Sequence, residues 1–94
     1  MMFMVIERFK NSDAQAVYDR LLREGRMMPE GLTYMGSWVE ANFDRCFQLM
    51  ECDDISLLQQ WVLQWRDLGE FEFVPVVPSE QVVEMMKPLV LESF

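Results

Sequence analysis

The sequence predicts a single α+β domain whose elements follow the order β-α-β-β-α-β. Two observations lead to this fold class. Strand-like and helix-like segments alternate in that order, and a chain of 94 residues has room for only one hydrophobic core. The composition, 51% apolar and 13% aromatic, is typical of a packed domain rather than a disordered chain. We expect residues 1–78 to form the domain and residues 79–94 to form a C-terminal tail.

The first strand and the first helix are predicted from a change in apolar periodicity. Residues 2–9 are apolar at both alternating sets of positions until Glu7, which is typical of a strand covered on both faces. Ser12 and Gln15 have the spacing of a capping box, and apolar residues then recur at helical intervals until Gly25. We therefore expect a helix that begins after Ser12 and ends before Gly25.

A hairpin and a second helix are expected next. Residues 32–40 and 45–52 are rich in aromatic and β-branched residues and are joined by a short polar link, which favours two paired strands. Gly36 indicates a bulge in the first of them. We expect Asp53 or Asp54 to cap a helix that Gly69 ends. Its apolar stripe consists of Ile55, Leu58, Trp61, Val62, Trp65 and Leu68.

The last strand and the tail both contain proline. Residues 70–77 form the fourth expected strand, and Pro75 favours an edge or bulged position because proline cannot donate to the ladder. A short helix should begin near Ser79, but Pro88 disfavours helical geometry at the residue before it, so residues 89–91 are expected to be extended. Because the tail is apolar, we expect it to pack on the sheet or on a dimer partner.

The sheet is expected to be covered on both faces, although two helices can cover only one. A second copy packed on the other face would give a homodimer, or a higher oligomer, with a cavity between two sheets. We assign the purely apolar set of strand positions to the helices: Met2, Met4, Ile6, Met35, Val39, Phe47, Leu49, Val74 and Val76. The mixed set is assigned to the cavity: Phe3, Val5, Glu7, Phe9, Tyr34, Trp38, Cys46, Gln48, Met50, Phe71 and Phe73. A slip of one residue would exchange the two sets in any strand.

The mixed set supplies the candidate ligand-binding residues: Glu7, Tyr34, Trp38, Cys46 and Gln48. Glu7 has apolar neighbours, and desolvation there would raise its pKa and suit it to act as a general base. In the alternative interpretation it pairs with Arg8 or Arg45, or emerges at the end of the strand. Tyr34 and Trp38 are alternatively packing residues.

The two cysteines are interpreted as free thiols. Cys46 and Cys52 are six residues apart on one expected strand, which is too far for a disulfide between them. Cys46 is a small buried residue unless a cation or a helix N-terminus activates it. Arg20, Arg23 and Arg26 form a basic stripe that we interpret as solvated and offset by neighbouring acids.

Charge and missing motifs exclude several classes of function. Sixteen acidic against eight basic residues give a net charge of −8, which disfavours nucleic acid and anionic membranes as partners. No apolar run approaches the roughly 20 residues of a membrane span, and no leader is recognised, so a cytoplasmic location is expected. The chain has no histidine, CxxC pair, phosphate-binding glycine loop or calcium loop. We therefore expect no metal and no cofactor.

Four segments carry a family resemblance: MFMVIERF, GLTYMGSWVEANFDRCFQLMECDD, LLQQWVLQW and FEFVPVVPS. The order of elements resembles the ferredoxin-like, dimeric α/β-barrel superfamily, which includes small monooxygenases and isomerases. Over residues 2–79 the chain more closely resembles domain of unknown function 3303. The characterised enzymes of the superfamily commonly use a pocket histidine, which this chain lacks, so the resemblance implies a fold without a defined activity.

Three functions remain open on the sequence alone. The first is a dimeric domain that binds a small, partly apolar ligand in the cavity between the sheets. The second is a cofactor-free isomerase or monooxygenase-like enzyme with Glu7 as its base. The third is a structural or protein-interaction module with a dry interface.

Overall fold

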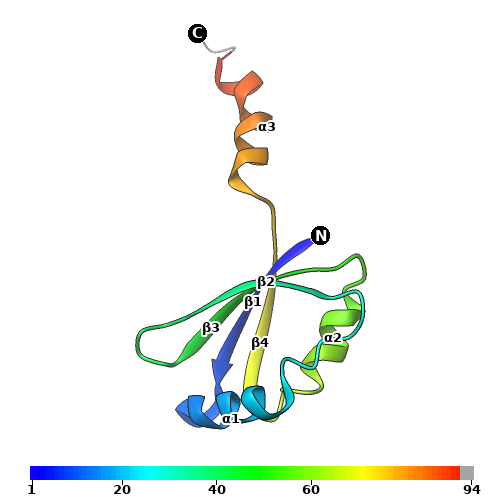
Figure 1. The fold of residues 1–94 in the computed structure, drawn as a ribbon. Helices are drawn as coiled ribbons and strands as arrows, with labels where there is room; N and C mark the ends of the chain where they lie inside the picture. Colours follow the sequence, from blue (N-terminus) through cyan, green and yellow to red (C-terminus); the bar gives the residue numbers. More distant parts are fainter. Residues whose placement is uncertain (92–94) are drawn as a thin grey trace.

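The computed structural model describes residues 1–91 and confirms the predicted order of strands and helices. Within these residues a 3-10 turn, η1 (Lys10–Ser12), follows the first strand, and α3 (Ser79–Leu91) follows the last. The α+β unit that runs from the first strand to the fourth is ferredoxin-like and is shown in Figure 1. Its elements are β1 (Met2–Phe9), α1 (Ala14–Glu24), β2 (Thr33–Val39), β3 (Arg45–Glu51), α2 (Ser56–Val62) and β4 (Gly69–Val76).

The four strands form one antiparallel sheet in the order β2-β3-β1-β4. The central strand β1 pairs with β3 on one side and β4 on the other, so that Glu7 lies opposite both Cys46 and Phe71. Strand β4 is at the edge of the sheet, where the missing N–H of Pro75 is tolerated. The edge position predicted from Pro75 is therefore confirmed.

The mixed set of strand residues faces the helices, so our assignment of the two faces was wrong. Along β1 the side chains of Phe3, Val5, Glu7 and Phe9 are buried, whereas those between them are more exposed. The same alternation in β3 buries Cys46, Gln48 and Met50. The period of two was predicted correctly. The purely apolar set lies on the uncovered face, apart from the β2 residues Met35, which is the extra residue of a bulge, and Val39, which pairs with Cys46. The aromatic side chains of the mixed set build the core with the helices, and the polar groups of the mixed set line a pocket beside this core.

A bulge in β2 changes the face on which its later residues lie. Tyr34 and Gly36 pair with consecutive residues of β3, so Met35 is the extra residue. Trp38 consequently lies opposite Phe47 on the uncovered face, and its side chain is 59% exposed. The placement of Tyr34 and Trp38 on one face was wrong. The bulge at Gly36, which the sequence indicated, is the physical reason.

Helix α1 begins at a different cap from the one predicted. The Asp13 carboxylate accepts a hydrogen bond from the backbone N–H of Ala16 at 3.1 Å, whereas Ser12 lies in the preceding 3-10 turn. Gly25 ends the helix as predicted, with a φ of 72° and an N–H bonded to the Leu21 carbonyl.

Helix α2 is shorter than its apolar stripe. Asp54 accepts a hydrogen bond from the N–H of Ser56 at 2.9 Å, so one of the two predicted capping residues serves the start of the helix. The α-helix ends at Val62, and residues 63–68 continue as turns in which several N–H groups bond to carbonyls three residues back. Trp61, in the helix, and Trp65, in these turns, are both buried.

Helix α3 projects away from the rest of the molecule (Figure 1), and none of its residues is buried. It continues through Pro88 to Leu91, so the extended conformation predicted for residues 89–91 was wrong. The proline stands near the end of an exposed helix, where the one carbonyl that it leaves without a helical donor remains open to water. Residues 79–91 of the expected tail extend away from the sheet, and packing of the tail on a dimer partner stays a prediction. Residues 92–94 of that tail lie outside the described residues.

Two further expectations concern single features of the chain. Cys46 and Cys52 are both buried and free, as predicted. None of the helices within residues 1–91 has the length and hydropathy to cross a bilayer.

Candidate functional site

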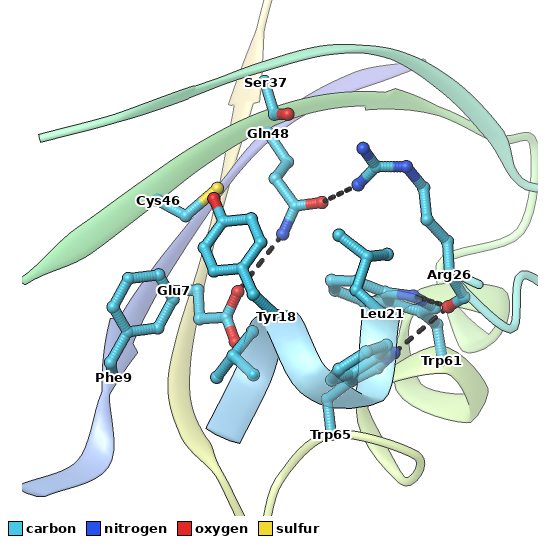
Figure 2. Close-up of a pocket in the computed structure, with 11 residues that line it drawn as sticks. Glu7, Phe9, Tyr18, Leu21, Arg26, Ser37, Cys46, Gln48, Trp61 and Trp65 are labelled. Atoms are coloured by element: carbon cyan, nitrogen blue, oxygen red, sulfur yellow. Dashed lines mark hydrogen bonds between the residues drawn. The ribbon is translucent and has the colours of Figure 1, made fainter. Parts of the chain in front are cut away.

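A pocket of about 100 Å³ lies between the sheet and the two helices that cover it. This volume is on the scale of cavities that hold a single small aromatic molecule. Figure 2 shows the side chains that surround it, which come from β1, β2, β3, α1, α2 and the segments that follow the two helices. We call it the Glu7 pocket, lined by Glu7, Phe9, Val17, Tyr18, Leu21, Arg26, Ser37, Cys46, Gln48, Trp61 and Trp65.

Glu7 is a buried acid with an incomplete set of partners. Its side chain is only 4% exposed, and Oε1 accepts one long hydrogen bond, from Gln48 Nε2 at 3.4 Å. Oε2 is buried and has no hydrogen-bond partner within the described chain. Burial raises the pKa of Glu7 from 4.5 to about 7, because water is removed from around its charged form. The group is therefore divided between its acid and its carboxylate near neutral pH.

Glu7 neither pairs with Arg8 or Arg45 nor emerges at the end of its strand, so both alternative interpretations of this residue are wrong. Arg8 is paired with Asp44, and Arg45 is paired with Glu40 at 2.8 Å, so neither arginine neutralises the buried acid. Both arginines lie on the other face of the sheet, as alternation along the strands requires. Glu7 does not emerge at the strand end either, since its side chain is buried.

Gly69 provides the space that the Glu7 carboxyl occupies. A Cβ atom added at Gly69 would lie 2.8 Å from Glu7 Oε2 and 3.0 Å from Glu7 Cγ, which is closer than real Cβ contacts. The sequence assigned Gly69 only to the end of a helix. It is in fact the buried first residue of β4, and it allows a carboxyl group to lie against the backbone of a neighbouring strand.

A side-chain amide connects the buried acid to an arginine. Gln48 donates to Glu7 through Nε2 and accepts from Arg26 Nη1 through Oε1 at 3.3 Å. The Arg26 guanidinium lies over the ring of Tyr34, 3.7 Å from its centroid, and the Tyr34 hydroxyl is 2.6 Å from the Ser37 hydroxyl. An acid and a cation thus share one pocket without contacting each other (Figure 2).

The backbone of Arg26 is held by two indoles. Trp61 Nε1 and Trp65 Nε1 both donate to the Arg26 carbonyl, at 2.9 and 3.1 Å. The turn that brings this carbonyl to them has positive φ at Gly25 and Met27, 72° and 56°. The two tryptophans predicted as core anchors are buried as expected, and they also position the segment that carries the pocket's cation.

Cys46 and Tyr18 complete the polar part of the wall. Burial, followed by the nearby Glu7 charge, raises the pKa of the Cys46 thiol to about 11, so the thiolate is scarce at neutral pH. The pKa of Tyr18 is also raised, mainly by burial. Neither group has the lowered pKa of an activated nucleophile, which agrees with the interpretation of Cys46 as a buried apolar residue.

The structure brings together part of the predicted site. Glu7, Cys46 and Gln48 line the pocket, and Tyr34 lies beside it under Arg26. Trp38 lies on the opposite face of the sheet. The pocket is within the chain, between sheet and helices, and not on the sheet face where the cavity was expected. Sequence reasoning missed Arg26, which follows α1 and was interpreted as one of three solvated arginines.

No metal-binding cluster was found in the part of the chain that the structure describes. A search of those residues for groups of three or more Cys, Asp and Glu side chains with the arrangement of a metal site finds none.

Fold and pocket together define a small ferredoxin-like α+β domain whose pocket contains the hydrogen-bonded side chains of Glu7, Gln48 and Arg26 and has aromatic walls. The model of the family described as "Domain of unknown function (DUF3303)" matches residues 1–90, and the chain belongs to this family. The match confirms the resemblance seen in the sequence and extends it into α3. A search of curated proteins and a search of solved structures each found no match to the chain.

Proposed function

We propose that this chain is a binding domain that holds one small, partly apolar molecule in the Glu7 pocket. The observation that carries the proposal is Glu7 Oε2, a buried acceptor that receives no hydrogen bond within residues 1–91, on a side chain that lines an aromatic-walled pocket. A buried polar atom that lacks a hydrogen bond costs about 1–3 kcal/mol. A ligand hydroxyl or amine that donates to Oε2 would remove this cost, while the ligand's apolar part packs on the pocket wall.

The indole N–H signals of the three tryptophans can report whether a ligand binds in the pocket. Trp61 and Trp65 line the pocket and Trp38 lies on the other face of the sheet, so their indole N–H signals report two different places. In a titration with phenol followed by NMR, we expect the Trp61 and Trp65 signals to shift and the Trp38 signal to stay. Toluene, which has the ring without the donor, should bind at least about tenfold more weakly.

A matched pair of variants tests the part played by the acid. Glu7→Leu removes both acceptors at similar size and should abolish the preference for phenol over toluene. Glu24→Leu makes the same change at an exposed acid of α1 and should preserve the preference. Phenol and toluene titrations without any shift at Trp61 and Trp65 would contradict the proposal and favour a purely structural module.

The second candidate function is proton abstraction with Glu7 as the base. It is favoured by the pKa of about 7 for Glu7, because a base is most effective when its pKa lies near the working pH. Exchange of the α-hydrogens of cyclopentanone for deuterium should then be faster with the unmodified chain than with Glu7→Gln. Equal exchange rates would exclude this role and leave the binding function intact.

We also propose that the chain forms a homodimer through the uncovered face of the sheet. The middle of this face is apolar and includes Met4, Ile6, Phe47 and Leu49, while Arg8, Arg45, Glu70 and Glu72 place both signs of charge at one end. Such a face can be complementary to its own copy about a twofold axis.

Sedimentation of the unmodified protein and of two variants tests whether the dimer forms. The unmodified chain should sediment as a dimer and Leu49→Lys as a monomer. Leu22→Lys is the control, because Leu22 is 85% exposed on α1 and lies away from this face. A monomeric unmodified chain would overturn the dimer without affecting the pocket.

A further inference from the structure

We propose that the molecule bound in the Glu7 pocket is a small organic carboxylate whose anionic group pairs with Arg26. This inference rests on the proposed binding function and names the chemical class of the ligand. The apolar part of the ligand would lie against the aromatic wall, with any hydroxyl group directed to Glu7.

The first support is the unpaired charge of Arg26. Within residues 1–91 its guanidinium forms no salt bridge, although Arg20 is bonded to Asp67 and Arg23 to Asp19 in the preceding helix. Acidic residues outnumber basic ones by two to one in this chain, 16 against 8, so a carboxylate partner would be easy to supply. The arginine that faces the pocket is nevertheless left without one.

The second support is that the guanidinium is held in place with donors to spare. The guanidinium lies over the Tyr34 ring, 3.7 Å from its centroid, and the Arg26 backbone carbonyl accepts from two buried indoles. Within residues 1–91, Nη1 is the only guanidinium atom that donates a hydrogen bond, to Gln48 at 3.3 Å. An arginine has five N–H donors in a planar fork that fits a carboxylate with two parallel hydrogen bonds. Holding the arginine in advance reduces the entropy lost when the ligand binds.

The polar side chains of the pocket, Glu7, Gln48 and Arg26, suit an anionic ligand better than a cationic one. A cationic ligand would be repelled by Arg26, which forms no salt bridge within residues 1–91 that would screen its charge. The anionic group of a ligand bound to Arg26 would be separated from Glu7 by Gln48, and Glu7 can accept a proton near neutral pH, which removes the repulsion. The negative net charge of −8 repels anions from most of the surface, and Arg26 is the cation that lines the pocket.

Benzoate and benzamide are the probes, because they have the same ring and nearly the same shape but differ in charge. Both are titrated into the folded chain below the pKa of Glu7, with the Trp61 and Trp65 indole signals as the readout. We expect benzoate to bind at least about tenfold more tightly than benzamide. Added sodium chloride should reduce this advantage by weakening benzoate alone.

Arginine variants locate the anionic group. Arg26→Gln should abolish the preference for benzoate, and Arg26→Lys should restore part of it. Arg23→Gln removes an exposed arginine of α1 and should leave the preference unchanged. If the Arg26 variants do not fold, the salt titration of the unmodified chain still tests whether the preference for benzoate is electrostatic.

Two failures are distinguishable in this experiment. Equal affinities for benzoate and benzamide in the unmodified chain, or a preference that survives Arg26→Gln, would overturn the carboxylate ligand and leave the pocket as a binding site. Absence of any shift at Trp61 and Trp65 with benzoate, benzamide and phenol would instead contradict the proposed function itself.

Discussion

Each of the two faces of the sheet contains side chains that its surroundings do not favour. The face covered by α1 and α2 contains a carboxyl group, an amide and a thiol, from Glu7, Gln48 and Cys46. The uncovered face is apolar along its middle, with Met4, Ile6 and their neighbours only partly exposed. A chain selected only for its own stability would place these side chains the other way round.

This distribution is the basis of the two proposals made above, a bound ligand and a second copy. The buried polar groups are explained if a ligand satisfies them, and the apolar uncovered face is explained if a second copy covers it. Of the four stability predictions below, the first three concern residues that form or pack on the two faces of the sheet, and the fourth concerns the tail.

The largest difference is expected between two tryptophans. Trp61 is 3% exposed and packs edge-on against Phe71, so Trp61→Ala should lower the free energy of unfolding by about 3–5 kcal/mol. Trp38→Ala, on the uncovered face, should change it by no more than about 0.5 kcal/mol when the chain is monomeric. Urea unfolding of both variants makes the comparison, and equal losses would contradict it.

The pH dependence of stability should depend on Glu7. Its pKa is about 7 in the folded chain against an ordinary value of 4.5, so folding takes up a proton between these two pH values. Its stabilising contribution is complete below pH 4.5 and is lost as the pH rises through 7, by about 3 kcal/mol in total. Unfolding measured across this range should show the decrease in the unmodified chain and in Glu24→Gln. The same slope in Glu7→Gln would contradict the assignment.

An intermediate effect is expected at Gly69. The methyl group of Gly69→Ala would collide with the Glu7 carboxyl and should destabilise the fold by about 1–3 kcal/mol. Adding Glu7→Ala should recover most of this loss, which a double-mutant cycle measures. Gly36→Ala is the control, because its methyl group would meet Trp38 at an ordinary 3.5 Å. Additive effects of the two changes would show that Gly69 and Glu7 are independent.

The smallest effect is expected from removal of the tail. None of the residues of α3 is buried, so a chain that ends at Pro78 should unfold with a free energy within about 0.5 kcal/mol of the full chain when both are monomeric. A larger loss under these conditions would show that residues 79–94 belong to the folded domain.

The sequence predicted the strands almost to their ends, because periodicity and turn residues are local signals. Residues 2–9 were predicted as a strand and form β1. The period of two also grouped Glu7 with Cys46 and Gln48, which share the pocket. Local signals do not identify which face meets the helices, since that depends on how the helices pack.

The parts of the site that the sequence missed depend on contacts between distant segments. Arg26 reaches the pocket because Trp61 and Trp65, 35 and 39 residues later, bind its carbonyl. Gly69 matters only because Glu7 lies beside it in the folded sheet. Trp38 was misplaced for a local reason, since one extra residue in β2 reverses the parity that follows.

The hydrogen bonds to the Arg26 carbonyl make Trp61 and Trp65 intrinsic fluorescent reporters of this segment. Two of the three tryptophans donate to this single oxygen atom, so any displacement of the Arg26 backbone changes the surroundings of both rings at once. Their fluorescence emission should therefore shift together when the segment moves, while the emission of Trp38 stays constant. Occupancy of the pocket could then be followed in solution without labelling the protein.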